Sequence, residues 1–452
     1  MCRFTPYFGA LLLAAWAVVS AASGAEPPAR VAEPSARVAG PAVPLGETVE
    51  RLVRQLDAEE LGERDAAERA LVALGPGALA ALPAELKDLP AEAAERLARV
   101  RQQLEKLHVT QSLKPTLITL QGKKMPLEKV LEAFSAQSGN RVVDHRENFG
   151  QQADPLTLDV NLSATPFWQA LDQVLDLGQL SIYPYGSEGA GVFVVARPKH
   201  HSSPKGRVAY AGAFRVEAQR IDASRDLRSG APGVLRLALA LSWEPRLTPI
   251  AVVHPLASLK ATGDDGEAIA AADSQGQVDV DIQDTSSTIE FELPMQMPPR
   301  RITRLASVKG QLQVLLRGPE GEFRFEELPI DAKGDDEKVQ QTRGDATVSI
   351  SRVRKNLEVW ELTMTARFEH PSRALESHRG WILNNKAVLT DRKGKIIEPG
   401  GYEMVGQSGN EVGIKYLFEL PQGPKGLAFV YTTPVAIIEV PVDYELRDLP
   451  LP

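Results

Sequence analysis

The chain has 452 residues, a formal net charge of −8 and a single cysteine, Cys2. One cysteine excludes a disulfide-stapled secreted domain and any cysteine zinc site. The acidic balance argues against nucleic acid as a partner, and the length predicts about three domains at roughly 100–200 residues each.

The first 25 residues predict a secretory signal peptide. Arg3 supplies a positive charge, Phe8 to Val19 is apolar, and Ser23-Gly24-Ala25 places small residues where a signal peptidase cleaves. The apolar stretch is shorter than the ~20 residues that span a bilayer, which favours cleavage over a membrane anchor. We therefore expect an exported protein, periplasmic or extracellular, with no membrane span after cleavage.

Residues 26–44 are rich in Pro and Ala without apolar periodicity, and they predict a flexible leader. Residues 45–110 then show apolar residues at helical spacing, interrupted by Gly75-Pro76-Gly77. This predicts a small all-α module of four short amphipathic helices. The segment LGERDAAERALVALGPGALAAL resembles a HEAT-type repeat, but it covers only about one and a half units. A solenoid needs more units for a stable core, so a compact module is expected.

The hydrophobic period changes in residues 116–198. Helical stripes around Phe134 and Phe167 are flanked by alternating strand patterns, such as Leu156, Leu158 and Val160. The pattern predicts an α+β domain in the order β-α-β-β-α-β-β, with its helices on one sheet face.

The segments ITLQGKKMPLEKVLEAFSAQSGNRVV and LTLDVNLSATPFWQALDQVLDLGQLSIYPYG resemble the short N-terminal domain of secretins and TonB-dependent receptors. The resemblance spans about 80 residues and rests on the two Pro-initiated helices. It implies a non-catalytic domain that contacts proteins in the periplasm. Neither a secretin ring domain nor a receptor barrel follows, so the resemblance does not identify a partner.

The remainder predicts two tandem all-β sandwich-like domains, at 210–330 and 342–452, joined at the charged stretch Asp331 to Gln341. An internal duplication supports this division. Alternating strands precede Trp243-Glu244-Pro245 and Glu369-His370-Pro371, and Phe-Glu-Leu-Pro occurs at both 291–294 and 418–421.

Catalytic patterns are weak in this sequence. There is no G-x-S-x-G nucleophile elbow, and His200 and His201 are adjacent in a Pro/Ser linker, where they make poor joint ligands. No cofactor is predicted. Weak calcium candidates are the acids of two turns, with ordinary turn chemistry as the simpler interpretation; they are Asp264, Asp265, Glu267, Asp279, Asp281 and Asp284.

Trp168 lies beside the buried stripe of its predicted helix, and it is the candidate for an exposed partner contact. The sequence as a whole favours a non-enzymatic envelope scaffold that docks proteins through the α+β domain and the β modules. The alternative is a protein that binds carbohydrate or a calcium-dependent ligand. An exposed row among Trp243, Trp360, Trp381 and Tyr402 would favour that alternative.

Overall fold

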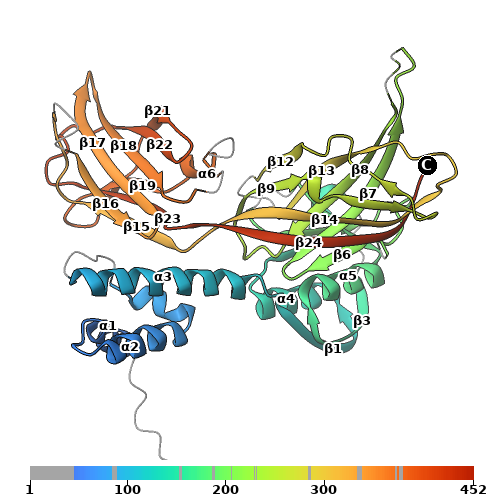
Figure 1. The fold of residues 1–452 in the computed structure, drawn as a ribbon, viewed down its shortest axis with the longest axis horizontal. Helices are drawn as coiled ribbons and strands as arrows, with labels where there is room; N and C mark the ends of the chain where they lie inside the picture. Colours follow the sequence, from blue (N-terminus) through green and yellow to red (C-terminus); the bar gives the residue numbers. More distant parts are fainter. Residues whose placement is uncertain are drawn as a thin grey trace, which may run out of the picture. The chain divides into compact units, whose positions relative to one another are not determined.

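The computed structural model describes residues 45–452 except 84–88, 152–154, 186–188, 205, 229, 231, 283–286, 333–337, 372–373 and 376–379. The predicted signal peptide (1–25) and leader (26–44) lie outside the described residues. The described chain begins with a small helical part and is otherwise mostly β (Figure 1). Every helix in the described ranges is too short or too polar to span a bilayer.

The helical module contains α1 (Leu45–Gln55), α2 (Leu61–Ala73), a 3-10 helix η1 (Pro76–Ala81) and α3 (Ala91–Ser112). Its apolar stripes form one buried cluster that includes Val49, Leu71 and Leu97. The third predicted helix is a short 3-10 helix, because Gly75 adopts a left-handed φ of 76° and Pro76 starts a new turn.

The short domain follows, with the predicted order of elements. It comprises β1 (Leu117–Pro126), α4 (Leu127–Ser138), β2 (Val142–Asp144), the 3-10 helix η2 (Glu147–Phe149), β3 (Thr157–Pro166), α5 (Phe167–Gly178), β4 (Leu180–Tyr183) and β5 (Val192–Ala196). The strands form two sheets, β1-β3 and β2-β5-β4, where the sequence predicted one. Phe134 and Phe167 are fully buried, as expected.

Strands β1 and β3 are related by an approximate two-fold repeat. Each leads through a proline directly into a helix, and each carries a bulge residue with positive φ: Lys124 at 50° and Ala164 at 45°. The Lys124 N–H donates to Asp159 Oδ1 at 2.7 Å, and the Ala164 N–H donates to Thr119 Oγ1 at 3.0 Å. Each strand therefore satisfies the bulged amide of the other.

The β region forms two modules, each built from two sheets. Module A contains the sheet β13-β8-β7-β6 and a second sheet in the order β11-β10-β14-β9-β12, with β24 also paired to β14. Its elements are β6 (Val208–Ala211), β7 (Phe214–Ser224), β8 (Val234–Trp243), β9 (Pro249–Pro255), η3 (Leu256–Ser258), β10 (Lys260–Gly263), β11 (Ala268–Ile269), β12 (Gln277–Asp281), β13 (Thr288–Gln296), β14 (Arg304–Arg317) and β24 (Ile437–Pro450).

Module B contains the sheets β16-β17-β18-β22-β21 and β15-β23-β19-β20. Its elements are β15 (Glu320–Phe325), β16 (Val339–Arg343), β17 (Ala346–Asn356), β18 (Val359–Phe368), α6 (Gly380–Leu383), β19 (Ala387–Thr390), β20 (Ile396–Ile397), β21 (Gly401–Gln407), β22 (Glu411–Phe418) and β23 (Ala428–Pro434). In each module, residues of both sheets contribute to one buried apolar cluster.

The β7-β8 and β17-β18 hairpins repeat the same geometry. Phe214 pairs with Trp243 and Ala346 with Phe368, and each hairpin has a bulge at the same distance from that pair. The repeated Phe-Glu-Leu-Pro does not take part in this correspondence. Phe291 lies opposite Leu239 in the middle of β8, whereas Phe418 lies opposite Trp360 at the start of β18. That element of the predicted duplication is wrong.

The predicted division at Asp331 to Gln341 is also wrong, because the modules exchange strands. Strand β15 directly follows β14 but pairs with β23 in module B. Strand β24 directly follows β23 but pairs with β14 in module A (Figure 1). The ranges 210–330 and 342–452 are therefore not separate domains.

The exchanged strands form one continuous antiparallel ribbon. A single register runs from the pair Arg304–Pro450 to the pair Phe325–Phe429. At the crossover, the Gly318 N–H donates to Ala436 O at 2.9 Å and the Val435 N–H donates to Pro319 O at 2.8 Å. Two chain segments, paired along their length, therefore connect the modules.

Candidate functional site: the junction of the short domain with module A

Trp168 belongs to a contact within the chain. Its side chain is only 2% exposed, and Nε1 donates a hydrogen bond to Ala213 O at 3.0 Å, just before β7. The prediction of an exposed partner contact is wrong, because the indole ring belongs to the apolar cluster of the short domain itself. Helix α5 therefore packs inside its own domain, and the Trp168 N–H ties it to module A.

A fully buried carboxylate, Glu244, holds the same junction. It follows the last residue of β8 and accepts hydrogen bonds from the Thr116 N–H at 2.9 Å, Thr116 Oγ1 at 2.9 Å and Asn140 Nδ2 at 3.0 Å. Arg246 Nε lies 2.8 Å away and supplies the compensating charge. A buried carboxylate with this many donors is satisfied, and its partners position the short domain.

Arg215 on β7 forms the second polar contact of the junction. It is 2% exposed and pairs with Asp172 of α5 at 2.9 Å and with Glu217 at 2.6 Å. Burial lowers the pKa of the Arg215 guanidinium. The charges of Asp172 and Glu217 raise this pKa by more than burial lowers it, so the net shift is upward. Tyr210 also donates to Asp172 at 2.6 Å. One guanidinium and two carboxylates thus form a buried ion-pair network that links α5 to β7.

A cleft of about 620 Å³ opens beside these pairs, between the short domain and the outer face of the sheet β13-β8-β7-β6. Its floor includes Ala240 and Ser242, and its walls include Glu217, Glu290 and Tyr185. The predicted linker residues His200 and His201 are exposed and also line this cleft. The sequence contained no signal that would bring these segments together.

Aromatic rings continue from the cleft over the short domain. Tyr183 and Tyr185 line the cleft with ring centroids 5.7 Å apart, and Phe149 packs against Tyr183 at 4.5 Å. Tyr185 is 66% exposed and Phe149 is 47% exposed. Exposed, clustered aromatic rings beside a cleft are typical of ligand-binding surfaces.

The calcium candidates are separated and engaged elsewhere. Asp265 and Glu267 pair with Arg301, and Asp264 accepts from Thr303 Oγ1 at 2.6 Å. Asp279 and Asp281 lie on β12, at the opposite end of the strand order from the β10-β11 turn; Asp284 lies outside the described residues. The acids of the first predicted turn are thus bound to Arg301 and Thr303, and the second turn is only partly described.

Within the described ranges, one group has metal-ligand geometry: Asp345, Glu369 and His370, with ligand atoms within 4.8 Å of one another. Glu369 and His370 are exposed. Glu369 occupies the place in module B that Glu244 occupies in module A, since its N–H donates to Asp345 O as that of Glu244 donates to Ala213 O. Exposed acidic groups of this kind are common, and the geometry alone assigns no ion.

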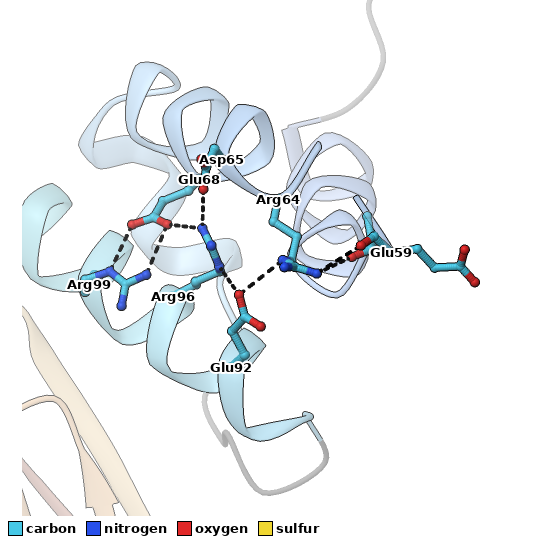
Figure 2. Close-up of polar contacts among 8 residues, drawn as sticks. Glu59, Arg64, Asp65, Glu68, Glu92, Arg96 and Arg99 are labelled. Atoms are coloured by element: carbon cyan, nitrogen blue, oxygen red, sulfur yellow. Dashed lines mark hydrogen bonds and ion pairs between the residues drawn. The ribbon is translucent and has the colours of Figure 1, made fainter. Parts of the chain in front are cut away.

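The helical module contains a dense polar cluster with a structural explanation (Figure 2). Arg96 of α3 is 7% exposed and contacts Asp65 at 2.8 Å and Glu68 at 2.9 Å, both on α2. Glu68 also accepts from Arg99, and Glu92 bridges Arg64 and Arg96. The network links α2 to α3. It gives Arg64 and Asp65 of the HEAT-like segment a structural role, because each of them contacts a residue of α3.

The aromatic residues that would favour carbohydrate binding do not form a row. Trp243 and Trp381 are buried, Trp360 is partly buried against the core of module B, and Tyr402 is 48% exposed. Comparison of the chain with family models, curated proteins and solved structures finds no match.

Proposed function

We propose that this chain is an exported, non-enzymatic scaffold of the cell envelope that binds partner proteins. The polar groups at the core of the junction support this proposal, because they form hydrogen bonds and ion pairs that join the short domain to module A. The resemblance of residues 116–198 to a periplasmic contact domain points in the same direction. The surfaces left for partners are those outside the junction.

One observation carries the proposal: β21 is an exposed edge strand with apolar side chains. It pairs with β22 on one side and lies at the end of the sheet β16-β17-β18-β22-β21. Tyr402 is 48% exposed, Met404 43% and Val405 48%. Natural edge strands are usually protected by charges, so an apolar edge favours a partner.

Two of these side chains lie on the inner face of their sheet. Tyr402 pairs with Tyr416 and Met404 with Ile414, and both of these β22 residues are buried in the core of module B. The inner face of the sheet is therefore buried at β22 but exposed at β21. An added strand would bond to the outer edge of β21, which pairs with no second strand among the described residues, and place its own apolar residues beside Tyr402 and Met404.

The test compares proteins that co-purify with the tagged full-length chain from the native host. The variant Tyr402→Lys/Met404→Lys places two charges on the edge, and Leu357→Lys, at an 87% exposed turn residue, is the matched control. We expect an envelope protein to co-purify with the wild type and with the control, and to be lost from the double variant. Equal recovery with the double variant would contradict strand addition at β21.

A further inference from the structure

The acid Glu290 lies at the cleft without a cationic partner among the described residues. It is exposed on β13, and its hydrogen bond comes from the neutral Tyr185 hydroxyl at 3.0 Å. The nearby acids differ in this respect, because Asp172 and Glu217 both pair with Arg215. Glu290 therefore remains an uncompensated negative charge beside an aromatic surface.

The arginines of the cleft are already engaged. Arg215 holds two carboxylates, Arg197 pairs with Asp176 at 2.6 Å, and Arg207 donates to the carbonyls of Ser202 and Ser203. These contacts leave Glu290 to attract a cation from outside. The net charge of −8 on the whole chain favours the approach of a basic partner.

The rings beside Glu290 suit a planar cation. Tyr183 and Tyr185 meet edge to face at 76°, so their faces point in different directions and offer more than one stacking surface. A guanidinium group stacks on an aromatic face while its N–H groups remain free for a carboxylate. The cleft of about 620 Å³ has room for an inserted side chain.

We propose that this cleft binds an arginine side chain of a partner protein, with the guanidinium stacked on Tyr183 and Tyr185 and paired with Glu290. The ligand releases Glu290 from the Tyr185 hydroxyl and pairs with the carboxylate directly. This inference rests on the proposed role in protein binding, but it does not depend on strand addition at β21.

The probe is N-acetyl-arginine methylamide, and the citrulline analogue, which has the same shape without the charge, is the comparison. Binding to the full-length chain is measured by saturation-transfer NMR with titration. We expect the arginine probe to bind and the citrulline probe to bind at least about ten-fold more weakly, because charge-assisted hydrogen bonds are lost. Equal signals from the two probes, or none from either, would overturn the proposal.

Variants locate the binding. Glu290→Gln is expected to weaken binding of the arginine probe roughly ten-fold or more. Tyr185→Ala is expected to weaken its binding as well. Glu292→Gln, on the same strand but paired with Arg220, is the matched control and should leave binding unchanged. Unchanged binding in Glu290→Gln would overturn the assignment. The Tyr402→Lys/Met404→Lys variant should bind the probe normally, so the two proposals fail separately.

Discussion

His254 on β9 and Tyr444 on β24 are hydrogen-bonded across the intervening strand β14, with His254 Nε2 2.8 Å from the Tyr444 hydroxyl. The contact passes over Gly310, where a Cβ would lie 2.5 Å from the hydroxyl and 2.7 Å from the imidazole nitrogen. Both side chains are buried. A polar pair of module A thus depends on a strand that follows module B in the chain.

Gly310→Ala should destabilise module A. The added methyl group meets the His254–Tyr444 pair, and overpacking in a buried site costs about 1–3 kcal/mol. Chemical denaturation of the full-length variant measures the loss. Gly409→Ala, where a Cβ would meet nothing within 4 Å, is the control and should unfold like the wild type. An unchanged midpoint for Gly310→Ala would contradict this packing.

Acid should weaken the same region. Burial lowers the pKa of His254 below its ordinary value of 6.5. The unfolded chain therefore takes up a proton first as pH falls, and the stability that neutral His254 contributes above pH 6.5 is lost as pH drops towards the folded pKa. The slope from one such group is at most about 1.4 kcal/mol per pH unit. In His254→Gln this part of the acid dependence should be absent, and an identical pH profile in the two proteins would refute the assignment.

Glu244→Ala should loosen the short domain from module A. The substitution leaves Arg246 and the Asn140 amide without their buried acceptor, and breaking a buried pair costs about 3–5 kcal/mol. Limited proteolysis between residues 198 and 208 should become faster. Glu369→Ala, at the equivalent but exposed position of module B, is the matched control, with an expected effect within about 0.5 kcal/mol. Equal effects at the two positions would contradict the role of Glu244.

A chain that ends at Ala436 should fail to fold module A. Strand β24 contributes buried Val440, Val442, Tyr444, Leu446 and Leu449, and burial of each is worth about 1.5–3 kcal/mol. Their sum rivals the stability of a whole domain, about 5–15 kcal/mol. Far-UV circular dichroism and thermal unfolding of the truncated chain measure this. Native-like unfolding of module A without β24 would show that the exchange is dispensable.

Local patterns predicted the order of elements in residues 116–198 because Phe134 and Phe167 fall on clear helical stripes between alternating strands. The placement of Trp168 could not be predicted in the same way. Helical periodicity places Trp168 at the margin of the buried face, and its indole N–H is satisfied by Ala213 O, a partner distant in sequence.

The strand exchange was hidden for a related physical reason. The alternation of apolar residues shows that a strand has one buried face, but it does not show which strand is its partner. A strand paired within its own module and a strand exchanged with the other module therefore look alike in sequence. Neighbours in sequence usually pair, so β14 and β15 were expected in one domain. The cleft could not be predicted from local sequence patterns either, because Tyr185 and Glu290 meet only through the contact of the short domain with module A.

The most direct test of the proposed function is site-specific photo-cross-linking in the native host, with a benzoylphenylalanine at Tyr402 and, separately, at Leu357. We expect a reproducible adduct with an envelope protein from position 402 and none from position 357. Adducts limited to this chain itself, or the same products from both positions, would contradict a scaffold that binds partners at β21.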